Sequence, residues 1–297
     1  MLRAHTKLRL TGTKLELSVE FFPPKTEEGM SRFVNAAKDL SKVNLNYASV
    51  TYGAGGSTKS GTMSAVDQLN GLFQSAVPHI SCVGSSEKQA QSLLDQYVAK
   101  RLNHLIVLRG DLPSGFGGSG EFQYASDLVR FIRKKFDSHF RIEVAAYPET
   151  HPQAKSCRDD IENFIAKVEA GADGAITQYF YNSDAYFRFV DEVGKFGVKI
   201  PIVPGIMPIT NYTQLVRFSD ACGAEVPRWI KNRLAQFADD SKSIKEFGLE
   251  VVSNLCDQLV TAGVPGLHFY SMNKSNMRIE ILKNVGLEKY EKMLEKK

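Results

Sequence analysis

Short apolar runs recur along the chain, and longer segments with apolar residues three or four positions apart separate them. Runs of this length are typical of buried strands, and the wider spacing is typical of helices packed on one face. Most runs are continuous rather than alternating, as expected for parallel strands covered on both faces. We predict strands at Leu15–Phe22, Tyr47–Tyr52, Ala76–Val83, His104–Leu108, Ile142–Tyr147, Ala175–Phe180, Ile200–Ile206 and Leu267–Ser271.

The segments between these strands predict the fold. The clearest helical spacing occurs in Ser86–Lys100, Asp159–Ala170, Ser183–Phe196 and Lys242–Ala262. Eight strands, each but the last followed by a helix, predict the α/β class and a single (β/α)8 TIM barrel. A doubly wound sheet would need fewer strands and usually a second domain. Residues 224–240 resemble a helical insertion before strand eight. We expect one domain over residues 1–297, with a core at about 15–285 and no regulatory domain.

Composition and charge exclude several classes of protein. Charged residues make up 24% and hydrophobic residues 43% of the 297 residues, which is typical of a globular chain. A net charge of +4 without a basic block does not indicate nucleic-acid binding. Without a signal peptide or an apolar stretch of membrane-spanning length, we expect a cytoplasmic protein. Scattered cysteines and histidines predict neither a disulfide framework nor a metal site.

Polar residues collect at the predicted strand ends. In a (β/α)8 barrel, catalytic and binding residues come from the carboxyl ends of the strands and the loops that follow them. We therefore expect a site at this end of the barrel. Its candidates are Glu20, Thr51, His79, Arg109, Asp111, Tyr147, His151, Gln178, Tyr270 and Asn273.

Glu20 lies inside an apolar run, Leu17–Phe22, and two interpretations of it stay open. Ionising a carboxyl group in such surroundings is costly unless the group is paired. Glu20 could therefore form an ion pair with an Arg or Lys of a neighbouring strand. Alternatively, burial could keep the carboxyl protonated, and a protonated carboxyl in a site is suited to donate a proton.

The Arg-Gly-Asp sequence at 109–111 ends the most apolar strand. It suits either a salt bridge with a turn glycine or a place where a flat ligand approaches the backbone. Residues 115–120 match G-x-G-x-x-G, but they stand away from the strand and the next helix begins near Tyr124, so we expect a barrel loop rather than a dinucleotide fingerprint. His79 and His151 could bind a cofactor or belong to the core and a loop.

Seven short segments together resemble the 5,10-methylenetetrahydrofolate reductases. They occur in order across residues 15–285, and jointly they are specific although each is modest alone. The length is similar to that of the short bacterial form, a catalytic barrel without a C-terminal regulatory domain. The segments are Val19–Lys25, Ser49–Ala54, Leu108–Pro113, Ala145–Pro152, Ala175–Gln178, Pro204–Pro208 and His268–Tyr270.

The resemblance implies a flavoenzyme of one-carbon metabolism and methionine synthesis. FAD would take a hydride from NADH or NADPH, with NADH favoured because the short bacterial relatives favour it. Methylenetetrahydrofolate would then bind in the same place and be reduced to 5-methyltetrahydrofolate. Opening of the folate ring needs a proton at N10, and Glu20 matches the family's general acid. Asp111 matches the carboxylate between flavin and folate, which stabilises the developing cation.

The resemblance also implies which residues bind the ligands. Flavin contacts carry over onto Thr51, His79, Arg109, Gly110, Asp111, Tyr124, Ala125, Tyr147, His151, Asp160, Asn163 and Lys167. Arg109 and Lys167 would meet the pyrophosphate, and Gln178, Tyr212 and Lys274 would contact the substrate. Three positions depart from some relatives: Ala166 and Lys274 replace Arg, and Tyr212 replaces Phe. At position 274 a charge remains, but the bidentate fork of arginine is lost.

Other functions stay open beside this one. The chain could be another FAD-containing barrel oxidoreductase, similar to proline dehydrogenase, although Glu20 and the run at 109–113 argue against it. It could also be a subunit of a larger complex, either non-catalytic or dependent on a partner chain for electrons. The presence of both Glu20 and Asp111 argues against a non-catalytic role. We further expect a homo-oligomer with a small-molecule folate substrate and no nucleic-acid or membrane partner.

Overall fold

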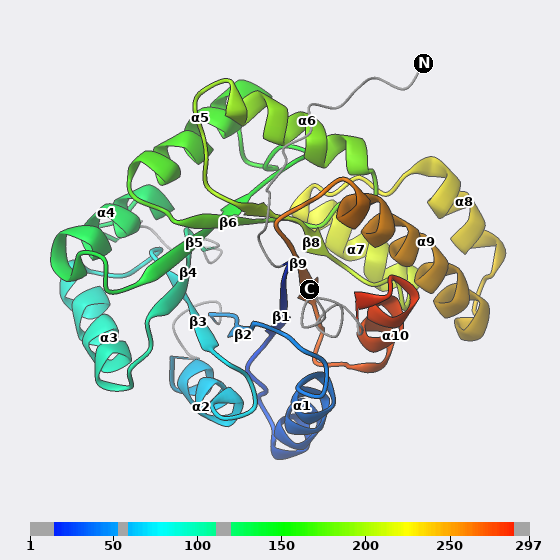
Figure 1. The fold of residues 1–297 in the computed structure, drawn as a ribbon, viewed down its shortest axis with the longest axis horizontal. Helices are drawn as coiled ribbons and strands as arrows, with labels where there is room; N and C mark the ends of the chain where they lie inside the picture. Colours follow the sequence, from blue (N-terminus) through cyan, green and yellow to red (C-terminus); the bar gives the residue numbers. More distant parts are fainter. Residues whose placement is uncertain (1–14, 53–58, 111–119, 288–297) are drawn as a thin grey trace, which may run out of the picture.

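Parallel strands form a ring at the centre of the molecule, and helices surround it (Figure 1). The computed structural model describes residues 15–52, 59–110 and 120–287. The strands are β1 (Glu16–Phe21), β2 (Tyr47–Val50), β3 (Ala76–Ser81), β4 (His104–Leu108), β5 (Arg141–Ala146), β6 (Gly174–Thr177), β7 (Ile202–Val203), β8 (Gly205–Ile206) and β9 (Gly266–Tyr270).

The sheet runs β7-β6-β5-β4-β3-β2-β1-β9-β8. Strand β7 pairs with β6, and β8 pairs with β9 at the other end of this order. Only Pro204 separates β7 from β8, so the two are halves of the seventh strand that we predicted at residues 200–206. A proline has no N–H to contribute to a ladder, which accounts for the break. Counted in this way the described residues form eight strands, and the predicted (β/α)8 barrel is confirmed.

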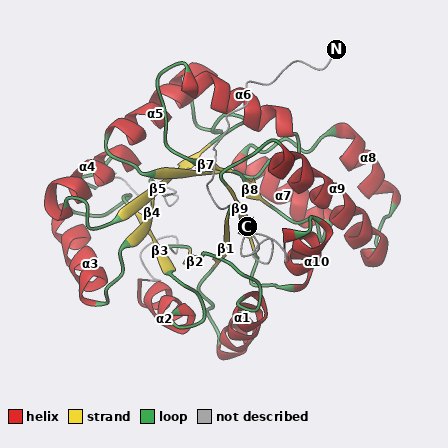
Figure 2. Cartoon of the chain, viewed as in Figure 1, coloured by secondary structure: helices red, strands yellow, loops and turns green. Residues whose placement is uncertain are grey.

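The helices lie outside the strands (Figure 2). The four helices predicted from spacing begin and end within two residues of the observed bounds, because local signals mark their ends. Ser86, for example, accepts a hydrogen bond from the Gln89 N–H and forms a capping box that starts α3. The helices are α1 (Glu27–Leu40), α2 (Lys59–Leu69), α3 (Glu87–Ala99), α4 (Ala125–Phe136), α5 (Cys157–Glu169), α6 (Ser183–Gly194), α7 (Tyr212–Cys222), α8 (Arg228–Gln236), α9 (Ser241–Thr261) and α10 (Asn276–Asn284).

Three helices, α7, α8 and α9, connect β8 to β9. Helix α8 lies within residues 224–240, and Figure 1 shows it at the edge of the molecule beside α9. That this segment is an insertion stays a prediction. None of the described helices is long and apolar enough to cross a membrane.

The strands carry different residues on their two faces. In β1, Leu17, Val19 and Phe21 belong to the main hydrophobic core, and Phe21 packs edge-on against Phe33 of α1 with ring centroids 5.1 Å apart. The alternate residues bear polar side chains that interact across the inside of the ring, as Ser18 does with β9. Layers of Val, Ile and Leu usually fill such barrels. This interior is instead partly polar, and β1 is one of the strands whose apolar residues alternate with polar ones.

Candidate active site

Glu20 stands near the carboxyl end of β1, and its side chain is 16% exposed. Its Oε2 lies 3.6 Å from Nε2 of His79 on β3 and 3.9 Å from Nε2 of His268 on β9. Among the described residues, these two histidines lie within 4.0 Å of the Glu20 carboxylate and no Arg or Lys does, so the alternative of an Arg or Lys partner is wrong. The barrel brings the three side chains together from strands that are distant in the sequence.

The two histidines differ in their surroundings. His268 Nδ1 lies 2.8 Å from Ser18 Oγ, a hydrogen bond between residues paired in the β1–β9 register. His79 is buried, and neither of its ring nitrogens has a hydrogen-bond partner in the described part of the chain. Burial lowers the pKa of His79 to about 4, against a smaller opposing effect of Glu20. His79 is thus neutral at pH 7 and supplies no positive charge to the carboxyl of Glu20.

A second polar cluster lies deeper in the barrel, toward the amino ends of the strands. The Tyr47 hydroxyl donates to Oε2 of Glu143 at 2.6 Å, and the Arg141 guanidinium donates to Oε1 of Glu143 at 2.6 Å. Arg141 also donates twice to Glu16 at 2.8 Å, and His104 Nε2 lies 3.3 Å from Glu143. Glu143 is completely buried, so these partners stabilise its charge. This cluster therefore occupies the barrel interior on the amino-terminal side of Glu20.

The exit of β4 contains Arg109 and Gly110. Gly110 has φ +85°, and a Cβ there would lie 1.9 Å from Ser81 Oγ, so a side chain is excluded by both conformation and space. The Arg109 carbonyl accepts from Ser81 Oγ at 2.8 Å, and its guanidinium donates to Gln153 Oε1. Asp111, which follows directly, lies outside the described residues.

Lys167 on α5 stands beside the same exit. Its Nζ donates to the Ala145 carbonyl at 2.6 Å. Burial lowers its pKa to about 8; the charge of Asp160 acts in the opposite direction and that of Arg109 adds to the fall. Asp160 in turn accepts from the His151 N–H at 2.9 Å, and burial raises the pKa of Asp160. Two cations and one carboxyl therefore lie near one another, an arrangement that favours an anionic ligand.

The other residues predicted to contact flavin follow β2 and β5 or lie at the start of α4 and on α5. The Tyr147 ring packs edge-on against the His151 ring with centroids 4.5 Å apart, directly after β5. Tyr124 is 51% exposed and occupies the N-cap position of α4, directly before Ala125, the first residue of the helix. The remaining two are Thr51, whose N–H donates to the Phe21 carbonyl, and Asn163, which is exposed on α5.

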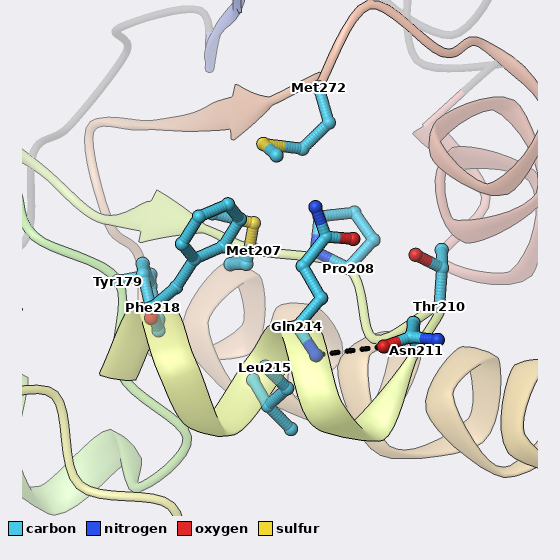
Figure 3. A pocket seen from close by; sticks show the side chains of 9 residues that line it. All are labelled: Tyr179, Met207, Pro208, Thr210, Asn211, Gln214, Leu215, Phe218 and Met272. Carbon is cyan, nitrogen blue, oxygen red and sulfur yellow. Dashed lines mark hydrogen bonds between the residues drawn. The ribbon is translucent and has the colours of Figure 1, made fainter. Parts of the chain in front are cut away.

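The residues predicted to contact the substrate lie at the exits of β6 and β9 and at the start of α7. Gln178 follows β6, Tyr212 is the first residue of α7 and Lys274 is exposed in the loop after β9. A small hollow lies between α7 and that loop, and Figure 3 shows Gln214 and Phe218 of α7 pointing toward Met272 across it. Its lining residues are Tyr179, Met207, Pro208, Thr210, Asn211, Gln214, Leu215, Phe218 and Met272.

Sequence reasoning missed several members of the interior, among them His268 and Glu143. His268 belonged to a recognised segment but received no role, and Glu143 received none although it lies in an apolar run, Ile142–Ala146, as Glu20 does in its own. That signal could have identified Glu143. No sequence signal shows that His268 and Glu20 approach each other, because the β1–β9 pairing joins opposite ends of the chain. Within the described ranges, no group of three or more His, Cys, Asp or Glu residues could hold a metal ion.

The barrel and the charged groups at the carboxyl ends of its strands define this chain as a (β/α)8-barrel enzyme. The family model for methylenetetrahydrofolate reductase matches residues 5–286. A 5,10-methylenetetrahydrofolate reductase of Escherichia coli (strain K12) is 35% identical over 277 residues, which cover 92% of each chain. The chain belongs to the methylenetetrahydrofolate reductase family.

Two further relatives extend the comparison. Methylenetetrahydrofolate reductase (NADH) 1 of Arabidopsis thaliana is 33% identical over 284 residues, which cover 91% of this chain and 48% of the plant protein. Among solved structures, an uncharacterized protein from Clostridium thermocellum, described as binding two copies of 5-methyl-5,6,7,8-tetrahydrofolic acid, matches with a TM-score of 0.66. It is 18% identical, and the match covers 95% of this chain and 96% of that one. At this identity the similarity supports the fold alone.

Proposed function

We propose that this chain reduces 5,10-methylenetetrahydrofolate to 5-methyltetrahydrofolate, with FAD as its bound cofactor and NADH as the hydride donor. Membership of the family supports the reaction, and the name of the Arabidopsis relative supports NADH. The observation that carries the proposal is the position of Glu20, a partly exposed carboxyl group at the barrel mouth between two buried histidines.

Glu20 would hold the proton that the substrate needs. The methylene bridge joins N5 and N10 of the folate, and it must open before carbon can accept a hydride. A proton delivered to N10 makes that nitrogen a leaving group, and a carboxyl group is suited to deliver it. Because His79 is neutral at pH 7, it supplies no positive charge to the Glu20 carboxyl group. The remaining exposure of Glu20 leaves its carboxyl within reach of a ligand from the mouth.

The residues at the β3, β4 and β5 exits fit FAD. The cations Arg109 and Lys167 suit a pyrophosphate, and Gly110 beside Arg109 stays a predicted flavin contact. The buried ring nitrogens of His79 lack hydrogen-bond partners within the described ranges, as expected for groups that complete their bonding with a ligand. When bound, FAD would supply the carrier for the hydride.

Each of these residues would have a distinct task. Arg109 and Lys167 would bind the diphosphate, and Asp160 would keep Lys167 oriented toward it through the opposite charge. Tyr147 and His151, which pack against each other, would form a wall of the cofactor site. Thr51, Tyr124, Ala125 and Asn163 stay predicted contacts, and so does Asp111, whose proposed task is to stabilise positive charge on the folate.

Substrate and NADH would use the same mouth in turn. Gln178, Tyr212 and Lys274 come from three elements around it, and the hollow beside Met272 adjoins them. We propose that all three ligands bind within the one barrel domain, which makes alternate binding of NADH and folate necessary. A homo-oligomer and a cytoplasmic location remain predictions that accompany this function.

Separate measurement of the two half-reactions tests the role of Glu20. Glu20→Gln keeps the size of the side chain but cannot donate an acidic proton. We expect its flavin to be bleached by NADH at a rate within about twofold of wild type, whereas reoxidation by methylenetetrahydrofolate slows by about 100-fold or more. Both rates are read from flavin absorbance in an anaerobic stopped-flow instrument.

The matched control is Glu28→Gln, the same substitution at an exposed position of α1. It should leave both half-reactions at their wild-type rates. Equal loss of both rates in Glu20→Gln would contradict the acid role. A wild-type protein that binds FAD but is not bleached by NADH or NADPH would favour the alternative of a subunit that receives electrons from a partner chain.

A further inference from the structure

The end of β9 is held by side chains where backbone pairing stops. On its β1 side, the Ser271 N–H donates to the Glu20 carbonyl at 3.0 Å. The next bond of a parallel ladder would join the Phe22 N–H to the Ser271 carbonyl. That carbonyl instead accepts from the Lys274 N–H at 2.9 Å, because the chain turns away into α10. The β1–β9 ladder therefore loses its backbone partner directly after Glu20.

Asn273 replaces the missing partner. Its Oδ1 accepts from the Phe22 N–H at 3.0 Å, and its Nδ2 donates to the Phe22 carbonyl at 2.8 Å. The side-chain amide thus satisfies both backbone groups of the second residue after Glu20. Asn273 and Met272 both have positive φ, of 52° and 50°, a conformation that asparagine tolerates better than most residues. The loop adopts this conformation while it presents the Asn273 amide to β1.

Arg278 acts on the β8 side of the same strand. The register pairs Ile206 with Phe269, so the next donor to the Tyr270 carbonyl would be the N–H of residue 208. Residue 208 is Pro208, which has no N–H. Arg278 of α10 donates to that carbonyl instead, through Nη2 at 2.8 Å.

The placement of Arg278 is unusual for a charged residue. Its side chain is among the largest fully buried ones, and burial lowers its pKa to about 9. No carboxylate within ion-pairing distance of it occurs in the described part of the chain, and its Nε has no hydrogen-bond partner there. A buried cation without a paired anion is costly. Despite this cost, burial places the Arg278 guanidinium against the Tyr270 carbonyl, to which it donates a hydrogen bond.

We propose that Asn273 and Arg278 form a clamp that positions Glu20 for proton delivery to the folate, an inference that rests on the proposed function. The two side chains hold the end of β9 against β1 and α10, and the Ser271 N–H in turn holds the Glu20 carbonyl. Tyr270, paired with Glu20 in register, is tied at its other end because its hydroxyl donates to the Thr177 carbonyl at 2.8 Å. Asn273 and Arg278 are positioning residues, since they act through β1 and β9.

A proton donor must be held at the correct distance and angle from the atom that it protonates. A displacement of about 1 Å in a reacting group can slow a reaction by about 100-fold. Loosening the clamp should therefore slow the step that uses Glu20 and spare the step that does not. A side chain with a purely structural role would lower both half-reactions together, or neither.

Two variants remove the clamp with little other change. Asn273→Gly deletes both hydrogen bonds to Phe22, and glycine tolerates the positive φ. Arg278→Met deletes the bond to Tyr270 while it fills similar space. In each variant we expect folate-driven reoxidation to slow by about tenfold or more and NADH bleaching to stay within about twofold of wild type. Arg278→Lys, which keeps one donor and the charge, should recover part of the lost rate.

The control variant is Arg101→Gly. Arg101 also has a positive φ, of 60°, but it is exposed before β4 at the opposite end of the barrel. It should match wild type in both half-reactions. If Arg278→Met fails to fold, Asn273→Gly and Arg278→Lys carry the test.

Amide hydrogen exchange, followed by mass spectrometry, gives a readout that needs no activity. Peptides that contain Phe22 and Ser271 should exchange faster in Asn273→Gly than in wild type and unchanged in Arg101→Gly. Faster exchange with an unchanged reoxidation rate would overturn the positioning role, and so would an equal slowing of both half-reactions or unchanged exchange. If wild-type protein turns over no folate, the proposed function fails, and the exchange result still reports whether the clamp exists.

Discussion

The buried carboxylate of Glu143 should make the stability of this barrel sensitive to acid. Burial alone would raise the pKa of Glu143, but the neighbouring His104, with its Nε2 3.3 Å away, the charge of Arg141 and the hydrogen bond from Tyr47 lower it from 4.5 to about 2. A pKa that is lower in the folded state stabilises the protein above pH 4.5, and this stabilisation is lost as the pH falls toward 2. The difference corresponds to about 3 kcal/mol, of which about 2 kcal/mol is lost by pH 3.

Urea unfolding of wild type and Glu143→Gln at several pH values measures this contribution. At pH 7 the variant should be less stable by about 3 kcal/mol or more, because Arg141 and His104 lose a buried partner. Between pH 7 and pH 3 the gap should narrow by about 2 kcal/mol, since the variant lacks the titrating group. The control is Glu169→Gln at an exposed position of α5. Its free energy of unfolding should differ from that of wild type by the same amount at every pH. A gap for Glu143→Gln that stays constant or widens in acid would refute the reasoning.

Two further predictions concern the exit of β4 and its neighbour. Lys167→Met should weaken FAD binding by about tenfold or more because it removes a half-buried cation, whereas exposed Lys155→Met should bind like wild type in a fluorescence titration; equal affinities would contradict the assignment. Gly110→Ala should lower the free energy of unfolding by about 1–3 kcal/mol, since its Cβ would meet Ser81. Gly197→Ala is the control, because Gly197 has a similar positive φ but open space where the Cβ would lie. If both variants lose the same free energy of unfolding, backbone conformation alone explains the loss at Gly110.

The strands and their exits could be predicted because their signals are local. The predicted and observed bounds of β4 are the same. Glu20 lies near the carboxyl end of β1, the end at which a barrel of eight strands is expected to have its site. Pro204, which the predicted seventh strand contains, divides the observed one into β7 and β8. The residue itself carries this signal, since it cannot donate to a ladder.

The interior could not be predicted because its contacts join distant parts of the chain. Tyr47 and Glu143 are 96 residues apart, and Ser18 and His268 are 250 residues apart. A sequence also does not reveal which face of a strand points into a barrel when both faces are covered. For this reason the sequence left two interpretations of Glu20 open, and the ring of strands brings His79 to it rather than an Arg or Lys.

We propose that this chain transfers a hydride from NADH to methylenetetrahydrofolate through bound FAD, and an anaerobic titration of the wild-type protein tests this most directly. One equivalent of NADH should bleach the flavin absorbance, and one equivalent of methylenetetrahydrofolate should then restore it with formation of one equivalent of 5-methyltetrahydrofolate. A purified protein that shows no flavin absorbance even after addition of FAD would contradict the account. So would a reduced flavin that methylenetetrahydrofolate leaves reduced.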